Sequence, residues 1–502
     1  MQLKEIVMTV TKKIFAVSIA CALLAANVYA QSDWGDDGAV EETSEPTFWD
    51  RFKISGDATL AGRAYFDSDK ASSTEVNVIP RLKLGFDYEG NATKFSSKLR
   101  FDEQTLKYDN EMILDEFSAD LFVGNWVLSA GKMKVVWGKG DKLHVLDNFN
   151  SNNYYDFLIP DYLDRRNSDY MFRAQYNSPL GFRLEGIYTP IMQPETYAQK
   201  GRWVPNKVNT LTNNVLTILD QKYTSLTPSS AKKVLSVSDD LYPDTHKLEY
   251  GQFGGYLNFT VGLFDFGVSY YNGRYKQVSA DVTGLACYQA IQLAPAAYRP
   301  TMQAALAGYL ANMMPSLHYD KVQSFGLDMQ TALGPFTIRA EAVYNLTKDM
   351  DGNDPWIRNN NIGYLLGFDV SLPIHNVTLN VQGTGNVILK KDKLLDNKIG
   401  GLVPTKTVDV DYDPTGCYTN HKVVVQLQDT FYYEKVTATV KAIYGIERYD
   451  LILMPEVSFK VRDGWKATAS GLFITNLNKE ENSEFLGWLN NSFIQLAVNY
   501  TF

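Results

Sequence analysis

The sequence predicts an all-β protein: a transmembrane, antiparallel, up-and-down β-barrel of about 18 strands, with long extracellular loops that contain short helices. Three observations predict this fold class. Apolar and polar residues alternate along most of the chain, short and long connections alternate between these runs, and the alternation continues into an aromatic C-terminal residue. The 31 Tyr, 26 Phe and 8 Trp among 502 residues suit a β-protein at a membrane interface. The net charge of −9 argues against nucleic acid as a partner.

Residues 1–30 are expected to be a secretory signal peptide. Lys12 and Lys13 precede an apolar run over residues 14–26, and residues 28–30 (Val-Tyr-Ala) resemble a cleavage site. This run of 13 residues is too short to span a bilayer. The mature chain is therefore expected to begin at Gln31, outside the cytoplasm.

Three cysteines are present. Cys21 is an alternative lipidation site, but the chain stays apolar beyond it. Cys287 and Cys417 lie in segments expected to be loops, and an oxidising compartment allows them to pair. Their spacing matches no zinc or redox motif, so a disulfide and two free thiols are both open.

Residues 31–50 are expected to form a solvated periplasmic segment, because they carry seven acids and no base. Residues 51–502 form the predicted barrel. The most apolar internal segment, residues 301–314, is only 14 residues long and amphipathic. It is too short for a membrane span and is expected to be a helix within a loop.

The alternation is clear at residues 81–88 (RLKLGFDY), 336–342 (FTIRAEA) and 436–442 (VTATVKA). Every second residue there is apolar, which indicates a strand with one apolar and one polar face. A soluble sandwich alternates as well, but its strands usually have about five or six residues. The runs here have roughly 10 to 14 residues, and a transmembrane strand needs about 9–11.

The connections fall into two classes, as is typical of outer-membrane barrels. Tight turns are expected at 88–91, 124–125, 178–181, 333–335, 373–376 and 462–464. Longer links are expected at 137–168, 191–247, 275–318, 347–360, 389–420 and 477–487. The short turns then mark the periplasmic rim and the long links the extracellular rim.

Eighteen strands are expected, at 51–66, 74–88, 92–103, 111–124, 126–136, 168–177, 182–190, 247–260, 262–274, 319–333, 336–347, 361–372, 376–388, 421–433, 436–446, 450–461, 465–476 and 488–502. An even number places both termini on the periplasmic side. Sixteen strands is the alternative if two weak edges are not strands.

The last strand carries an additional signal. Ile494, Leu496, Val498, Tyr500 and Phe502 share one face, opposite small and polar residues. A final strand that ends in an aromatic residue resembles the signal recognised by outer-membrane barrel assembly machinery, with Val498, Tyr500 and Phe502 as the residues concerned. An ordinary half-buried strand is the alternative.

In a barrel surrounded by lipid, the polar residues of each strand line the lumen. Parity assigns these basic residues to the lumen: Arg81, Lys83, Lys98, Arg100, Arg173, Arg183 and Arg339. Five acidic residues accompany them: Asp87, Asp102, Glu185, Asp328 and Glu341. An excess of positive charge favours anions, whereas mutual compensation gives a mixed lining of ion pairs. Both interpretations are open.

The densest polar constellation lies at residues 131–142, 148–150 and 161–166. A strand ends at Trp137, glycines permit a sharp re-entry, and a polar and aromatic loop leads to a pair of arginines. Here the sequence resembles bacterial outer-membrane porin-like barrels, similar in plan to carbohydrate and alginate porins. The resemblance covers the mature chain in architecture and residues 131–166 in motif. It implies diffusion of a polar solute through a pore that an inward-folded loop constricts.

The resemblance also implies which residues line or brace the constriction. These are Lys134, Trp137, Lys139, Asp141, Lys142, Asp161, Asp164, Arg165 and Arg166. The alternative is that the three aspartates only pin the loop through ion pairs with neighbouring Lys and Arg.

The two longest loops are expected to contain helices near 207–221, 229–237 and 301–313. Acidic clusters at 349–354 and 409–413 have alternating carboxylates, but neither has the register and closing Glu of an EF-hand. Solvated loop tips are therefore expected, with no metal and no cofactor.

The sequence favours a channel for small polar solutes, with anions as candidates, in the outer membrane. An enzyme is not expected, because the five histidines are scattered and form no known catalytic pattern. The alternatives are a fatty-acid-type transporter, which would need a plug and an apolar lumen, and a surface adhesin or scaffold displayed on the barrel. The expected partners are outer-membrane lipid, the barrel assembly machinery and a small polar solute.

Overall fold

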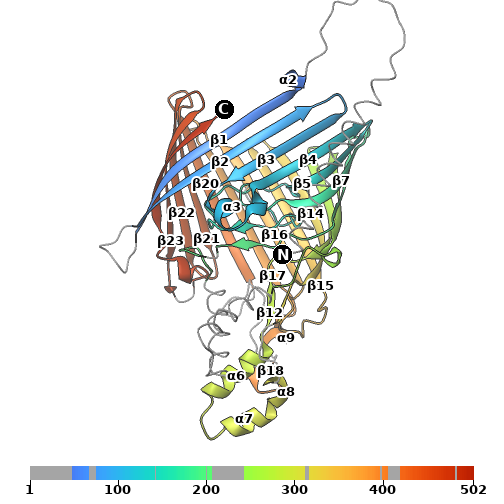
Figure 1. Cartoon of the computed structure of the whole chain (residues 1–502), viewed down its shortest axis with the longest axis vertical. Coiled ribbons are helices and arrows are strands. Elements are labelled where there is room, and N and C mark those ends of the chain that lie inside the picture. Colours follow the sequence, from blue (N-terminus) through green and yellow to red (C-terminus); the bar gives the residue numbers. More distant parts are fainter. Residues whose placement is uncertain are drawn as a thin grey trace, which may run out of the picture.

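Figure 1 shows the computed structural model of the chain. It describes residues 48–66, 75–141, 143–198, 200–205, 242–310, 316–395, 398–404, 419–480 and 483–502. Within this part, one 18-stranded sheet confirms the predicted fold class and strand number. Its strands are β1 (Phe52–Tyr65), β2 (Glu75–Glu89), β3 (Thr93–Phe101), β4 (Leu114–Val123), β5 (Trp126–Met133), β7 (Asp169–Asn177), β8 (Arg183–Thr189), β10 (Gln252–Val261), β11 (Phe264–Arg274), β14 (Lys321–Leu333), β15 (Phe336–Thr347), β16 (Asn361–Ser371), β17 (Thr378–Ile388), β20 (Thr419–Phe431), β21 (Val436–Gly445), β22 (Asp450–Arg462), β23 (Trp465–Asn476) and β24 (Phe493–Thr501). The expected signal peptide and residues 31–47 of the acidic segment lie outside the described residues.

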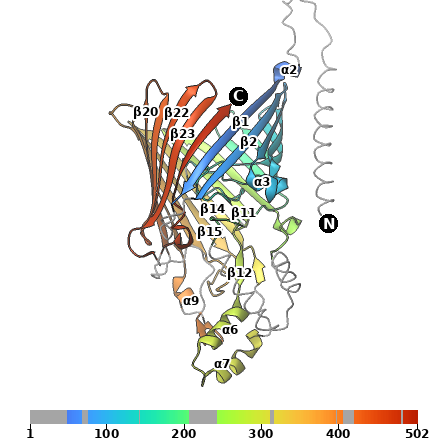
Figure 2. The same ribbon diagram turned by 60° about the vertical axis from the view of Figure 1, so that its left-hand side comes forward.

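Each of these strands pairs antiparallel with the next along the chain, and β1 pairs with β24 to close the barrel. At the seam, the Gly56 N–H donates to the Phe502 carbonyl at 2.9 Å, and the Phe502 N–H donates to the Gly56 carbonyl at 3.0 Å. The Phe502 ring covers Gly56, where any side chain would collide with it. Closure leaves no free edge at the seam, and Figures 1 and 2 show tilted strands around a central space.

The two faces of the barrel wall differ in polarity as the alternation predicts. On β24, Ile494, Leu496 and Val498 are exposed on the outer face. On its inner face, Phe493 is buried and Gln495 accepts a hydrogen bond of 3.0 Å from Arg63 of β1. An apolar exterior and a polar interior are what lipid outside and water inside require.

Short and long connections occupy opposite rims, as predicted. One rim has tight turns such as 124–125 and 463–464, and the other has loops such as 134–168 and 190–251. The link at 446–449 is short although it belongs to the long-loop rim.

Most strand boundaries agree with the sequence within a few residues. The largest differences are at β10, expected from 247, and β24, expected from 488; both begin later because short 3₁₀ turns, η2 (Leu248–Tyr250) and η4 (Leu486–Trp488), precede them.

The remaining elements lie mostly in the loops. They are α2 (Phe48–Arg51), α3 (Glu103–Lys107), η1 (Asn110–Ile113), α6 (Thr283–Leu293), α7 (Arg299–Ala305), α8 (Ala307–Leu310), α9 (Lys391–Leu395) and the short strands β6 (Asn153–Tyr154), β9 (Thr196–Tyr197), β12 (Ser279–Asp281), β13 (Ser316–His318), β18 (Lys398–Ile399) and β19 (Val403–Pro404). The helix expected at 301–313 is present as α7 and α8. No helix of the described chain is long and apolar enough to cross a membrane.

Helix α6 was not predicted, and it corrects the expectation that Cys287 lies in a loop. Cys287 is buried in α6, packed among Ile291, Leu306 and Ile399. An apolar stretch without charged residues gave little helical periodicity to detect. Cys417 and the helices expected near 207–221 and 229–237 lie outside the described residues.

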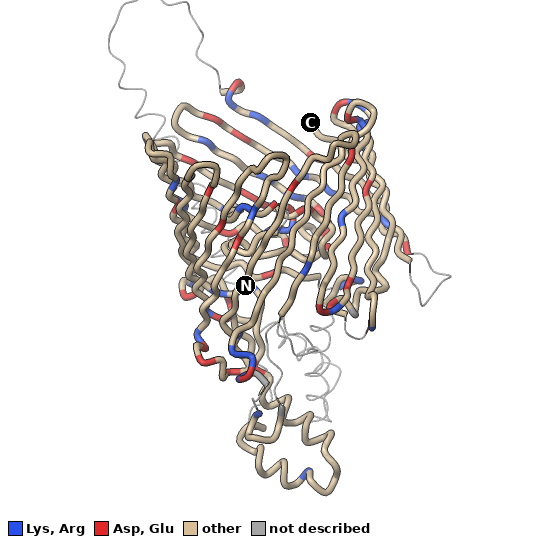
Figure 3. Tube along the Cα trace, turned by 180° about the vertical axis from the view of Figure 1, so that it is seen from behind, with Lys and Arg blue, Asp and Glu red and all other residues tan. Residues whose placement is uncertain are grey.

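Helices α6, α7 and α8 project beyond the long-loop rim (Figures 1 and 2). Between residues 283 and 310, Arg299 is the only charged residue, and the projecting tip is correspondingly tan in Figure 3. Leu293 is 87% exposed there. The tip is therefore a mainly uncharged surface beyond the long-loop rim.

Candidate functional site: a lumen narrowed by an inward loop

The loop between β5 and β7, residues 134–168, is called the inward loop below. Its Trp137 and Phe149 are buried with Tyr256 of β10 and Tyr271 of β11. The Trp137 and Phe149 rings meet edge to face, 5.0 Å between centroids, and Trp137 Nε1 donates to Glu185 Oε1 of β8 at 2.7 Å. Because these partners lie on the inner barrel wall, the loop folds into the lumen.

Glu341 of β15 clamps the inward loop from the barrel wall. Its fully buried carboxylate accepts the Gly140 N–H at 2.6 Å and the Val145 N–H at 2.8 Å, and lies 3.0 Å from His144 Nδ1. Gly138 lies so close to this carboxylate that a Cβ would sit 2.2 Å from Oε1, and its φ is +109°. Only glycine suits that backbone and that space.

A second anchor lies within the inward loop. Arg166 is buried and meets Asp147 at 2.9 Å, and the Tyr162 hydroxyl donates to the same carboxylate at 2.5 Å. Burial raises the pKa of Asp147, although Arg166 and Tyr162 act in the opposite direction. Asn150 joins the two ends of the loop, since it accepts the Val135 N–H at 2.7 Å and donates to the carbonyls flanking the loop at 2.9 Å.

The inward loop reaches strands on several sides of the barrel. Asp156 meets Arg63 of β1 at 2.7 Å, and Asp164 meets Lys83 of β2 at 2.7 Å. Further round the barrel, Asp161 meets Lys441 of β21 at 3.3 Å. One loop held at these separate points crosses the lumen and narrows it.

The structure separates the nine predicted constriction residues into groups. Trp137, Lys134 and Arg166 are buried as braces, with Lys134 held by Asp115 at 3.0 Å. Lys139 donates to Asn258 at 3.3 Å, and Asp141 accepts from Asn380 at 3.3 Å.

The other predicted residues behave differently. Asp161 is 81% exposed, so it faces open space while meeting Lys441. Arg165 has a buried Nε without a hydrogen-bond partner among the described residues. Lys142 lies outside the described residues. Asp161 and Asp164 each form an ion pair, with Lys441 and Lys83 of the barrel wall. Such ion pairs are what the alternative interpretation, in which the aspartates only hold the loop in place, expects.

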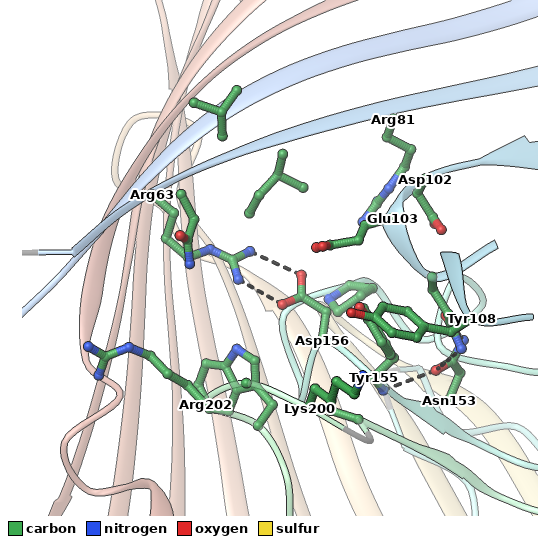
Figure 4. A pocket seen from close by; sticks show the side chains of 18 of the residues that line it. Arg63, Arg81, Asp102, Glu103, Tyr108, Asn153, Tyr155, Asp156, Lys200 and Arg202 are labelled. Atoms are coloured by element: carbon green, nitrogen blue, oxygen red, sulfur yellow. Dashed lines mark hydrogen bonds and ion pairs between the residues drawn. The ribbon is translucent and has the colours of Figure 1, made fainter. Parts of the chain in front are cut away.

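A cavity of about 600 Å³ lies beside the inward loop, against the inner face of β1, β2 and β3 (Figure 4). Helix α3, Asp115 of β4 and parts of the segments 153–164 and 200–203 also line it. The lining contains six cations, Arg63, Arg81, Lys83, Arg100, Lys200 and Arg202, and six acids, Glu75, Asp102, Glu103, Asp115, Asp156 and Asp164. Four aromatic rings also line it: Tyr65, Tyr108, Tyr155 and Trp203.

All six acids of this cavity are paired with a cation. The pairs are Asp156 with Arg63 (2.7 Å), Glu75 with Arg202 (2.7 Å), Asp164 with Lys83 (2.7 Å), Asp102 with Arg100 (3.3 Å), Asp115 with Lys134 (3.0 Å) and Glu103 with Lys107 (2.9 Å). Arg81 and Lys200 make no hydrogen bond or ion pair with any residue that the structure describes, and Figure 4 labels both beside the cavity. The cavity therefore holds two cations that form no ion pair among the described residues, although its lining has as many acids as cations.

The positive field of this region acts on Asp164. Burial alone would raise the pKa of its carboxyl group, but the nearby Lys83, Arg81 and Lys134 outweigh burial and lower it. The carboxylate therefore stays ionised and keeps its hold on Lys83.

The strand register places all seven predicted basic lumen residues on the inner face. Several of them form ion pairs with acidic residues of the barrel wall. Arg173 meets Glu185 at 2.5 Å, Lys98 meets Glu116 at 3.1 Å, and Arg339 pairs with Asp369. The lumen lining is therefore mixed, and Arg81, Lys200 and Arg183 are basic residues without an ion pair among the described residues.

Sequence reasoning missed several residues of the cavity. Arg63 follows the β1 alternation and was detectable by parity, since Ala61 and Tyr65 share its inner face. Lys200 and Arg202 come from a loop 190–251, and no periodicity links them to β2. The pairing of Arg202 with Glu75 depends on the folded path of that loop.

The wall, the inward loop and the cavity define the class of this molecule: a transmembrane antiparallel β-barrel with a loop-narrowed, charged lumen. A scan against protein-family models and a search of curated proteins found no match to the chain. Among solved structures, it is similar to OccAB4 of Acinetobacter baumannii, at 12% identity over 90% of this chain and 97% of that chain, with a TM-score of 0.44.

Two further structures are similar at the same level. OccK11 (OpdR) of Pseudomonas aeruginosa has 9% identity over 90% of this chain and 95% of that chain, with a TM-score of 0.44. A loop-deleted OmpT, an outer membrane protein of Vibrio cholerae, has 9% identity over 90% of this chain and 100% of that chain, with a TM-score of 0.36. At such distances, the function of this chain has to be inferred from its own residues.

Proposed function

We propose that the protein is an outer-membrane channel for small polar solutes and that it prefers anions. The observation that carries the preference is the pair Arg81 and Lys200, which face the cavity without a carboxylate partner among the described residues. A solute carboxylate or phosphate would supply that partner, because positive side chains in a pore select anions.

The channel itself is supported by the barrel's apolar exterior, polar interior and inward loop. Eighteen strands enclose more space than wall side chains fill, and the inward loop reduces it. The rings of Tyr108, Tyr155 and Trp203 beside the cations offer flat apolar surfaces. Such a lining suits an organic acid with a carbon skeleton, such as a sugar acid.

The test is the reversal potential of the refolded full chain in a planar bilayer under a salt gradient. We expect stepwise conductance with anion selectivity, and organic anions should block the current better than neutral sugars. The double substitution Arg81→Gln, Lys200→Gln should remove most of that selectivity. Lys435→Gln is the control for loss of a positive charge away from the cavity, because Lys435 is exposed in the turn between β20 and β21. Clear cation selectivity of the unmodified protein would overturn the preference for anions.

A second candidate function is surface display, which the projecting α6–α8 tip favours. Its uncharged, exposed surface lies at the extracellular end, and such patches often mark binding sites. A barrel that folds but conducts no current would support display over transport. A fatty-acid-type route is not favoured, since the lumen and cavity are charged.

A further inference from the structure

The barrel wall has a gap beside β2. All 15 residues of β2, from Glu75 to Glu89, belong to the sheet, and β1 pairs with Glu75 to Tyr88. On its other side, β3 pairs only with residues 82–89, because β3 ends at Phe101 and the chain continues into α3. Residues 75–81 therefore have no strand partner on that side in the described chain.

The cavity reaches this free edge. Its lining includes the consecutive residues Glu75, Val76, Asn77, Val78 and Ile79. Successive strand residues point to opposite faces of a sheet. Contact with five consecutive residues places the cavity along the free edge of β2, beside α3, where no strand of the described chain closes the wall.

The rim of this opening, called the side port below, is apolar on the membrane side. Val76 and Val78, on the outer face of β2, are 63% and 69% exposed. Pro80 lies within the free edge, and proline is confined to edges because it lacks an N–H.

The height of the side port follows from strand geometry. A strand rises about 3.3 Å per residue and tilts by roughly 40°, so the eight paired residues 82–89 reach about 20 Å above the periplasmic turn. The apolar belt of a barrel is about 25 Å tall. Residues 75–81 then cross from the top of the hydrocarbon layer into the polar head groups of the outer leaflet.

An open strand edge is not tolerated in hydrocarbon, because unpaired N–H and C=O groups need polar partners. At this height the bilayer itself supplies such partners in its head groups. Just inside the side port, Arg81 is the last residue of the free edge, and Lys200 lines the same cavity. An apolar rim with two unpaired cations behind it matches a molecule that is apolar at one end and anionic at the other.

We propose that the side port holds the phosphate-bearing head group of an anionic lipid from the outer leaflet, with its acyl chains outside against Val76 and Val78. The inference rests on the proposed outer-membrane function only for the location of the barrel. The lipid is bound and not transported, because the charged lumen behind the cations offers no path for its chains. The bound head group supplies polar partners to the free β2 edge and approaches Arg81 and Lys200 from the wall.

The test uses the full chain with all three cysteines changed to Ser and a fluorophore attached at Val78→Cys. The protein is placed in phosphatidylcholine vesicles that contain an equal fraction of brominated phosphatidate or brominated phosphatidylcholine, and quenching by the two lipids is compared. Two cations near a membrane surface should enrich phosphatidate roughly thirtyfold at this position. Leu84→Cys is the matched control, since it lies on the outer face of β2 where β3 pairs, and we expect no preference there.

Arg81→Gln with Lys200→Gln should return the Val78 quenching ratio to about that of the control. Equal quenching by both lipids at Val78 in the unsubstituted protein overturns the lipid site. Loss of the lipid preference when inorganic phosphate replaces chloride at equal ionic strength also overturns the lipid site, because Arg81 and Lys200 then bind a soluble anion. Anion-selective conductance without a lipid preference refutes only the proposed lipid site. A lipid preference in a barrel that conducts no current refutes only the proposed channel function.

Discussion

Replacing Glu341 tests whether the inward loop limits flow through the barrel. The carboxylate accepts backbone N–H groups from Gly140 and Val145 at 2.6 and 2.8 Å. Hydrogen bonds to a charged group contribute about 1.5–3 kcal/mol each. Glu341→Ala should therefore remove roughly 3–6 kcal/mol of anchoring from these two bonds. Glu341→Gln keeps the shape but turns an N–H toward one donor, and about half of that anchoring should be lost.

Single-channel recording measures the outcome. We expect larger open-channel conductance and stronger current noise in Glu341→Ala, and an intermediate effect in Glu341→Gln, because a released loop leaves the pore axis part of the time. Heat-modifiability in detergent gels should stay unchanged, since the strand ladder is intact. Glu456→Gln is the control, because the register puts Glu456 on the inner face without a hydrogen bond to any described residue. Wild-type conductance and noise in Glu341→Ala would refute the role given to the loop.

Three other substitutions give independent predictions. Trp137→Phe removes the hydrogen-bond donor to Glu185, whose buried carboxylate then keeps only its ion pair with Arg173. The inward loop should be destabilised by about 1–3 kcal/mol. Unchanged open-channel noise would contradict this prediction. Deleting Phe502 removes two seam hydrogen bonds and should lower the temperature of the gel-mobility shift; no lowering would contradict its role in closure. The hydrogen bond to Asp320 raises the pKa of His318 above 6.5, so the pair stabilises loop 275–320 below that pH and loses its effect as the pH rises through the raised value. Trypsin should cleave this loop faster above that range than below it, and His318→Gln should abolish the difference.

The fold was predictable because lipid and water impose a two-residue period that every strand has to obey. Strand number follows from that period, and the alternation of short and long connections gives the strand order and the two rims. The inner-face position of residues such as Arg81 and Arg339 follows from it as well. What parity does not supply is the partner of each charge.

The candidate site was less predictable, because it is made by loops. The clamp on the inward loop joins Gly140 to Glu341, 201 residues apart, and no local pattern encodes that contact. Trp137 was predicted to line or brace the constriction, and the structure makes it a buried brace, since its ring packs on Tyr256. The gap beside β2 arises because β3 is shorter than β2; a β3 extended to the expected residue 103 would still leave residues 75–79 unpaired in this register.

The long reach of the inward loop has a consequence for biogenesis. Its attachment points on β15 and β21 lie far downstream in the chain, and the Asp161–Lys441 contact spans 280 residues. The inward loop can narrow the lumen fully only after β15 and β21 are in place, so during assembly the barrel passes through a stage with a wider lumen. Cells would be exposed to leakage at that stage unless the last hairpins join quickly, which gives the closing strand a protective role in addition to its structural one.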